Sequence, residues 1–214
     1  MKFERSAEIF AAAKQLIPGG VNSPVRAYRS VGGTPVHMAR GNGAYVWDVD
    51  GNRYIDLVMS YGPLILGHCD PRVVKAIQAT AATGTCFGTP SQGELDMARE
   101  ITSRVPGCEM VRLVNSGTEA IEAALKLAKR VTGRTQLIAC KGAYHGNTHG
   151  SMSVSYNEKK KATFRPLLPD VEFIGFNTIS DLERITHKTA CVIAETIQGD
   201  AGVRVPTKKY LKAV

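Results

Sequence analysis

The chain has no two cysteines in the C-x-x-C spacing, although it contains five cysteines in 214 residues. Their odd number and wide separation argue against a disulfide framework and against a zinc site, so no metal is expected. Free thiols are typical of a reducing compartment, and we therefore expect a cytoplasmic protein. The cysteines are Cys69, Cys86, Cys108, Cys140 and Cys191.

Long apolar runs are also missing. No stretch of about 18 apolar residues occurs, so the sequence predicts no membrane-spanning helix and no membrane partner. The first twenty residues carry charges through their opening turns and contain no continuous apolar segment of the signal-peptide type.

A basic stripe interleaved with aromatic residues, the mark of many nucleic-acid-binding proteins, is absent too. The formal net charge is +8, but lysine and arginine are scattered except in the short run 159–161. We therefore expect no nucleic-acid partner. Hydrophobic residues at 43% and charged residues at 21% are typical of a globular protein with a sizeable core.

The first segment, residues 1–56, reads as a helix followed by a small β-meander. Apolar residues recur at helical spacing over residues 4–16, and Pro18 with two glycines ends that helix. Three short β-type runs follow, separated by turn residues such as Asn and Gly. They cover residues 35–38, 44–48 and 53–56.

Residues 57–214 alternate between helical and strand patterns. This alternation predicts an α/β fold with a mainly parallel sheet and helices on both faces. We expect the domain to be incomplete, because residues 208–214 read as a helix that is only beginning. The predicted helices are 71–81, 92–104, 118–131 and 179–186, and the predicted strands are 110–114, 136–139, 171–175 and 190–194.

A strand, a turn and a helix meet in the stretch VRLVNSGTEA at residues 111–120. Ser116 and Glu119 have the spacing of a capping box, and most capping boxes hold no ligand. However, Gly117 permits close approach to the backbone, and Thr118 adds a hydroxyl at the positive end of the helix dipole. The turn also follows a strand of a parallel sheet, which favours a phosphate site.

Two further strand ends carry polar or aromatic residues. Tyr144 and His145 follow one predicted strand, and Glu195 follows another. A tyrosine ring can stack on a planar heteroaromatic ligand, and a carboxylate can steer an amine. Taken alone, an aromatic residue followed by His-Gly is more often a packed loop, and a solvated glutamate at a strand end is as ordinary as a functional one. The convergence of three strand ends favours a ligand site.

Four stretches of the chain resemble the class III aminotransferases of the pyridoxal-phosphate (PLP) transferase fold type I. They span residues 17–35, 43–56, 62–77 and 111–120, and within the class they are most similar to the glutamate-1-semialdehyde 2,1-aminomutases. The resemblance implies pyridoxal 5'-phosphate as the cofactor. Ser116, Gly117 and Thr118 would hold its phosphate, and Tyr144 would lie on its ring with His145 alongside.

The same resemblance implies a small amino-acid or amino-aldehyde substrate and a homodimer. Arg26 matches the arginine that binds the substrate carboxylate, and Ser23 lies nearby in the sequence. Tyr61 stands where the aminomutases usually have tryptophan. With Glu195, these residues form the predicted substrate site.

The second half departs from the aminomutase pattern. Residues 153–169 are shorter than the gating segment of the aminomutases, and Asp200 replaces a usual asparagine. Both features resemble the ornithine and acetylornithine aminotransferases, so the chain is either a divergent aminotransferase or a junction of two relatives near residues 120–145. No lysine has the context of the Schiff-base lysine. We therefore expect the parent protein to be an enzyme, while these residues alone form either its half-site or a catalytically inactive fragment that binds PLP or phosphate.

Overall fold

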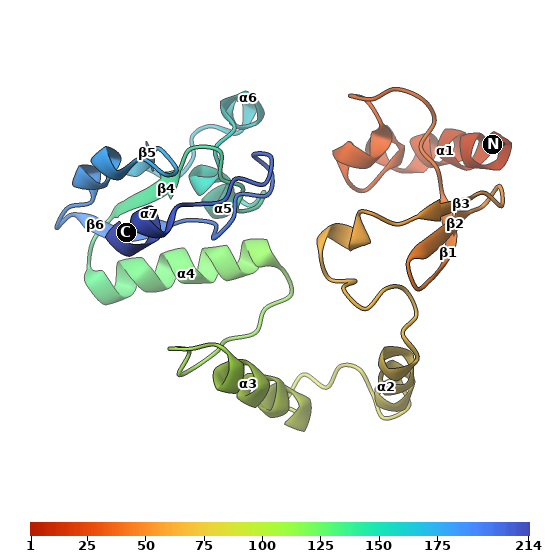
Figure 1. Ribbon diagram of the computed structural model, residues 1–214, viewed down its shortest axis with the longest axis horizontal. Helices are drawn as coiled ribbons and strands as arrows, with labels where there is room; N and C mark the ends of the chain where they lie inside the picture. Colours follow the sequence, from red (N-terminus) through yellow and green to blue (C-terminus); the bar gives the residue numbers. More distant parts are fainter. The chain divides into compact units, whose positions relative to one another are not determined.

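The computed structural model describes all 214 residues and divides them into two compact units, residues 1–90 and 91–214 (Figure 1). The two compact units divide after Pro90. The domain boundary that the sequence pattern predicts after residue 56 is a different division of the chain, and it stays a prediction.

The first unit contains a leading helix, a three-stranded antiparallel meander and a second helix. The predicted leading helix and the predicted helix at 71–81 are confirmed, but the first strand begins at residue 38, three residues later than expected. Gly43 has φ +53° and the hairpin turn lies there, so the pairing of Asn42 with Tyr45 closes the hairpin. The elements are α1 (Glu4–Leu16), β1 (Met38–Asn42), β2 (Tyr45–Asp48), β3 (Arg53–Ile55) and α2 (Pro71–Ala81), with 3₁₀ turns at Pro18–Gly20, Pro24–Ala27 and Met59–Tyr61.

Two carboxylates stabilise the meander, and one of them joins it to α1. The buried Asp48 accepts hydrogen bonds from the Tyr54 hydroxyl at 2.6 Å and from the Asn52 side chain at 2.8 Å. Asp50 accepts from the backbone N–H groups of Arg5 at 2.7 Å and Ser6 at 3.0 Å, at the start of α1. These bonds satisfy amides that a helix leaves unpaired in its first turn, so the turn between β2 and β3 also caps α1.

The second unit is built on a three-stranded parallel sheet in the order β5-β4-β6 (Figure 1). Helix α4 is the longest element of the unit and ends at Gly133, which adopts the left-handed conformation. The strands are β4 (Gln136–Cys140), β5 (Val171–Ile174) and β6 (Thr189–Ile193). The helices are α3 (Gln92–Arg104), α4 (Gly117–Thr132), α5 (His149–Val154), α6 (Glu158–Lys161) and α7 (Lys208–Ala213), with 3₁₀ turns at Ala162–Phe164 and Ile179–Arg184.

The central strand β4 is buried on both faces. Leu137 packs with Leu125 of α4 and Val154 of α5, whereas Ile138 packs on the opposite face with Phe176 and Tyr210. Successive side chains of a strand point to opposite faces, so this division places helices on both sides of the sheet. The predicted architecture is therefore confirmed for this unit.

Two predicted elements of the second unit differ from the structure, and two helices were not predicted at all. Residues 110–114 form no strand, because no other segment pairs with them; Met110 is 90% exposed. The predicted helix at 179–186 is a 3₁₀ segment of six residues, and Asp181 bonds the Gly175 amide at 2.7 Å instead of supporting a helix. Helices α5 and α6 had no sequence signal that we recognised. None of the helices combines the length and the apolar character needed to cross a membrane.

Candidate functional site

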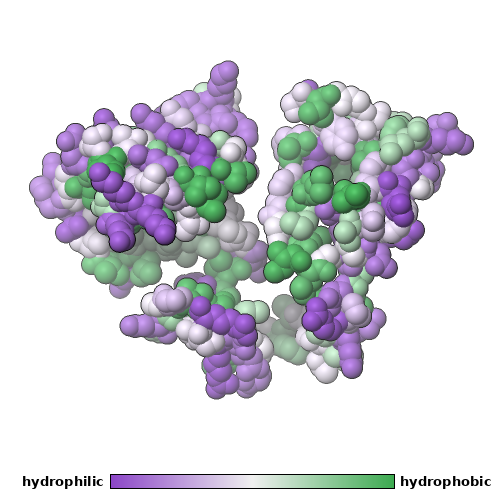
Figure 2. Space-filling view, viewed as in Figure 1, coloured by the Kyte–Doolittle hydropathy of each residue, from purple (hydrophilic) through white to green (hydrophobic).

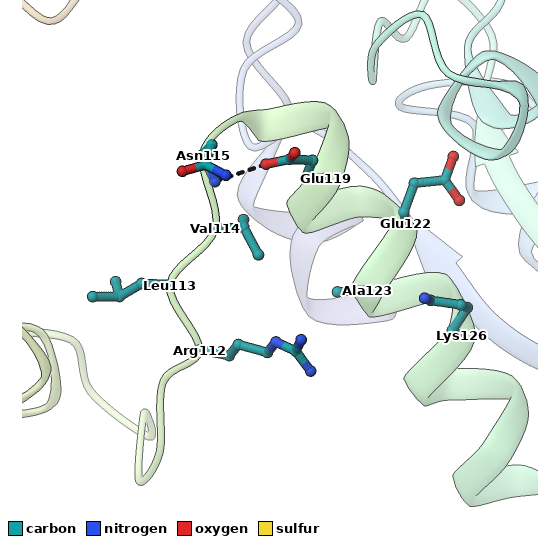
Figure 3. Close-up of a pocket in the computed structure, with 8 residues that line it drawn as sticks. All are labelled: Arg112, Leu113, Val114, Asn115, Glu119, Glu122, Ala123 and Lys126. Carbon is teal, nitrogen blue, oxygen red and sulfur yellow. Dashed lines mark hydrogen bonds between the residues drawn. The ribbon is translucent and has the colours of Figure 1, made fainter. Parts of the chain in front are cut away.

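Helix α4 begins at a capping arrangement that differs from the predicted one. The Ser116 Oγ accepts a hydrogen bond from the Glu119 amide at 3.3 Å, as expected for an N-cap. The Glu119 carboxylate, however, accepts from the backbone N–H of Asn115 at 2.7 Å rather than from that of Ser116 (Figure 3). The reciprocal half of the capping box is therefore displaced by one residue, and it fixes the turn that enters the helix.

Two backbone amides at this turn have no protein acceptor. The Ala120 amide bonds the Ser116 carbonyl at 3.1 Å and the Glu119 amide bonds the Ser116 side chain, but Gly117 and Thr118 donate to nothing in the chain. A Cβ added at Gly117 would meet no atom within 4 Å, so open space lies above it. Unpaired amides at the positive end of a 16-residue helix suit an anion such as phosphate.

The Thr118 side chain faces a loop of its own unit. Its Oγ1 lies 2.5 Å from Ser151 Oγ and 3.1 Å from Thr148 Oγ1. The hydroxyl is thus already hydrogen-bonded, which leaves the backbone amide of Thr118 as the donor available to an anion. Thr148 and Ser151 belong to the loop that follows β4 and to the first turn of α5 that continues it, so these bonds join the start of α4 to the carboxyl end of the sheet.

Tyr144 and Glu195 lie together, as the parallel sheet predicts. They follow β4 and β6, and the Tyr144 amide donates to Glu195 Oε2 at 3.2 Å. The Tyr144 hydroxyl accepts from the Asn147 side chain at 3.0 Å, while 44% of the tyrosine remains exposed. The exposed tyrosine offers an aromatic surface of the kind that stacks on a planar ligand.

His145 lies beneath this loop rather than on its surface. Only 8% of the residue is exposed, and its backbone amide donates to Ser155 Oγ at 2.8 Å. The ring atom Nε2 is buried without a hydrogen-bond partner. Burial lowers the pKa of His145, against a smaller opposing effect of the Glu195 carboxylate, so the imidazole is neutral at neutral pH.

We expect this buried imidazole to make stability fall as the pH is lowered. The unfolded chain binds the proton near the ordinary pKa of 6.5, whereas the folded chain resists it, so the stabilising contribution is present above that pH and is lost below it. Urea unfolding at several values between about pH 7.5 and pH 5.5 should show the decline, and His145→Gln should flatten it.

The exposed His187 provides the matched control for that measurement. His187→Gln removes an imidazole of the same kind and should retain the wild-type pH dependence. If the two variants gave the same profile, the decline would come from groups other than His145.

The residues predicted to bind substrate belong to the first unit, apart from Glu195. Ser23 precedes a 3₁₀ turn that contains Arg26, and the Arg26 amide donates to the Ser23 carbonyl at 2.9 Å. The Arg26 guanidinium is exposed and has no ion pair. Tyr61 is 74% exposed and ends a run of three left-handed residues that begins at Met59. Such runs are rare outside glycine and concentrate at functional sites.

A cavity of about 500 Å³ lies beside α4, next to the turn that holds Ser116 (Figure 3). None of the predicted site residues lines this cavity. Glu122 does line it, and it was not among the functional candidates identified from the sequence. The available signal was its position four residues after Thr118, on the same face of the helix. The residues that line the cavity are Arg112, Leu113, Val114, Asn115, Glu119, Glu122, Ala123 and Lys126.

The chain is similar in sequence to glutamate-1-semialdehyde 2,1-aminomutases over its whole length. The enzyme from Alkaliphilus metalliredigens is 45% identical over 100% of this chain and 51% of its own length. The enzyme from Persephonella marina is 44% identical over 98% of this chain and 52% of its own. The chain thus spans about half the length of the curated relatives it matches.

Solved structures share the fold. A transaminase with PLP bound matches 100% of this chain and 52% of its own with a TM-score of 0.86 and 31% identity. The ornithine aminotransferase of Toxoplasma gondii matches 97% of this chain and 49% of its own with a TM-score of 0.82 and 30% identity. These matches confirm the predicted PLP-transferase fold and the two resemblances read from the sequence. The family model for class III aminotransferases matches residues 27–214, and the chain therefore belongs to that family.

Proposed function

We propose that this chain forms the cofactor-phosphate half of an enzyme that moves amino groups with pyridoxal 5'-phosphate, the cofactor of class III aminotransferases. The observation that carries the proposal is the pair of unpaired amides at Gly117 and Thr118, at the start of α4. They suit the phosphate of the cofactor, because a helix N-terminus stabilises negative charge.

The surroundings of these amides fit the rest of the cofactor. Tyr144 presents an exposed aromatic ring at the same end of the unit, suited to a flat pyridine. His145 contributes a buried Nε2 without a partner, an atom that a further polar group would satisfy. When bound, pyridoxal phosphate supplies an electron sink for amino-group chemistry.

The chain's other polar residues would act on the substrate. The Arg26 guanidinium offers a planar fork suited to a carboxylate, with Ser23 nearby, and Tyr61 would form an aromatic wall. Glu195 would steer a substrate amine while its two oxygens hold the amides of Tyr144 and Gly199.

The specific activity that we propose is that of a glutamate-1-semialdehyde 2,1-aminomutase, which converts glutamate-1-semialdehyde to 5-aminolevulinate. Its support is the 43–45% identity to such enzymes across 98–100% of the chain. An aminomutase returns nitrogen to the same carbon skeleton and needs no second substrate.

An aminotransferase of the ornithine or acetylornithine type is the second candidate. Residues 153–169, which correspond to the gating segment of an aminomutase, are held in place here by the buried Lys161. Its Nζ donates to the Ser155 carbonyl at 3.0 Å and to the Ser153 carbonyl at 3.3 Å. It also forms an ion pair with Glu158 at 3.3 Å. A buried ammonium with three partners holds its segment in place.

Product analysis separates the two activities. The whole protein, supplied with glutamate-1-semialdehyde alone, should form 5-aminolevulinate if it is an aminomutase. If product forms only when an amino acid and an oxo acid are added together, the aminotransferase assignment replaces it.

The half-site itself is tested on the 214-residue chain by titration with pyridoxal phosphate and with pyridoxal, which lacks the phosphate. The phosphate ester should bind more tightly by about tenfold or more, because two charge-assisted amide bonds are added. Equal affinities would contradict the phosphate site. Binding without any turnover would identify these residues as a ligand-binding fragment only.

We also propose a homodimer for the whole protein. Apolar side chains remain uncovered in each unit, as the space-filling view shows (Figure 2). They include Leu57 and Ile65 of the first unit, at 86% and 80% exposure, and Val131 of α4, at 76%. Surfaces of this kind favour association. Sedimentation of the whole protein at several concentrations would reveal a monomer if the proposal is wrong.

A further inference from the structure

Glu122 is the only carboxylate that reaches from α4 into the loop after β4. Its Oε1 accepts hydrogen bonds from the backbone N–H groups of Gly150 at 2.9 Å and Ser151 at 3.1 Å, and from the Thr148 hydroxyl. These donors belong to the first turn of α5, so Glu122 satisfies amides that the short helix leaves unpaired.

The same loop holds the Thr118 hydroxyl. Ser151 Oγ lies 2.5 Å from Thr118 Oγ1 and accepts from the Thr148 amide at 3.1 Å. Thr118 and Glu122 are one helical turn apart on α4, about 6 Å along its axis. The loop is therefore attached to the helix at two successive points, Thr118 and Glu122. The backbone amide of Thr118 is one of the two amides proposed to bind the cofactor phosphate.

The loop and the helix are in close contact at two glycines, where neither position has space for a side chain. A Cβ added at Gly150 would overlap the Glu122 carboxylate, and one added at Gly146 would lie 2.6 Å from Thr118 Cβ. Gly150, Ser151 and Gly146 are buried. Contacts this close transmit a displacement of the loop directly to Thr118.

Glu122 is held in its charged form. Burial alone would raise the pKa of its carboxyl group, but hydrogen bonds from Thr148, Ser151 and Gly150, with the nearby Lys126 ammonium, lower it below the ordinary value. A charged acceptor makes stronger hydrogen bonds than a neutral one, so the loop is firmly attached at neutral pH.

We infer that Glu122 is a positioning residue for the cofactor-phosphate site: through Thr148 and Ser151 it fixes the Thr118 side chain and thereby aims the Thr118 amide. This role rests on the function proposed above for the start of α4. It is distinct from direct binding, since Glu122 carries the same sign of charge as a phosphate and would repel it.

Because of that repulsion, the direction in which the affinity for pyridoxal phosphate changes when the carboxylate is removed distinguishes the two roles. If Glu122 acted only through its charge, removal of the carboxylate would strengthen phosphate binding. If it acts by positioning, Glu122→Ala should weaken the affinity for pyridoxal phosphate by about tenfold, the size of one lost charge-assisted hydrogen bond, and leave that for pyridoxal unchanged. Glu122→Gln, which loses the charge but keeps an acceptor oxygen, should restore most of the affinity.

Two further variants of the 214-residue chain complete the test. Ser151→Ala removes the shorter of the two hydroxyl contacts of Thr118, keeps the contact with Thr148 at 3.1 Å and leaves the backbone amides on Glu122, so it should weaken the affinity for pyridoxal phosphate in the same direction even if Glu122→Ala does not fold. Glu183→Ala removes an exposed carboxylate that makes no hydrogen bond or ion pair, and it should bind like wild type.

Amide measurements on the ligand-free chain decide the positioning role independently of cofactor affinity. In Glu122→Ala, hydrogen exchange at Gly150 and Ser151 should accelerate about tenfold or more, and the Thr118 amide resonance should move. An unmoved Thr118 resonance, or tighter phosphate binding in Glu122→Ala, overturns the inference. If the wild type did not prefer pyridoxal phosphate over pyridoxal, the proposed function would be overturned instead. The Thr118 amide resonance in Glu122→Ala would still show whether Glu122 positions Thr118.

Discussion

Gly146→Ala is expected to destabilise the second unit by about 2–5 kcal/mol and to abolish any preference for a phosphate-bearing ligand. Gly146 has φ +129°, a conformation that residues with a side chain rarely adopt. An added Cβ would also lie 2.6 Å from Thr118 Cβ and 2.7 Å from Ser151 Oγ, so the helix and the loop would have to separate. Urea unfolding measures the first effect, and titration with pyridoxal phosphate and pyridoxal measures the second.

Gly202 separates the two causes. It also has a positive φ, +93°, but an added Cβ would meet nothing within 4 Å. Gly202→Ala should therefore cost only the conformational strain, about 1–3 kcal/mol, and leave ligand preference intact. If both variants lost the same stability and Gly146→Ala still preferred pyridoxal phosphate, close packing at Thr118 would not shape the site.

Local sequence signals were sufficient for most helices of the fold. Asp70 accepts from the Arg72 amide and Pro71 stands at the first position of α2, an arrangement readable from the sequence because capping acts within a few residues. Ser91 and Glu94 form the capping box of α3 in the same way. Such elements are specified by neighbours in the chain.

Strand formation depends on partners that are distant in sequence, and here local signals failed. Residues 110–114 have the apolar composition of a strand, but no segment pairs with them, whereas the equally apolar β4 lies between β5 and β6. Composition alone could not distinguish these cases.

The candidate site shows the same division. Ser116 and the open amides after it follow from a local pattern, and the pairing of Tyr144 with Glu195 follows from the parallel order of their strands. The Glu122 contacts could not be predicted, because its partners lie 26–29 residues away at the start of the short helix α5, for which we recognised no sequence signal. Likewise, the burial of His145 depends on packing that a lone aromatic-histidine pair does not reveal.

The central strand supplies the second large effect. Ile138→Ala should lower the free energy of unfolding of the second unit by about 2–5 kcal/mol, because a fully buried aliphatic side chain would be replaced by a cavity. Ile138 is 0% exposed and packs with Ile174 of β5 and Tyr210 of α7. The neighbouring strand and a helix distant in sequence cannot both move in to fill the space, since each is also held by other contacts.

Leu127 of α4 is the matched control for Ile138, because it is an aliphatic residue of the same unit that is 61% exposed. Leu127→Ala should change the free energy of unfolding by less than about 0.5 kcal/mol. Urea titrations of both variants, followed by circular dichroism, make the comparison. Similar losses would mean that α4 buries Leu127 against another surface in solution, whereas a large loss confined to Ile138→Ala would place the stabilising core at β4, the strand whose carboxyl end carries Tyr144 and His145.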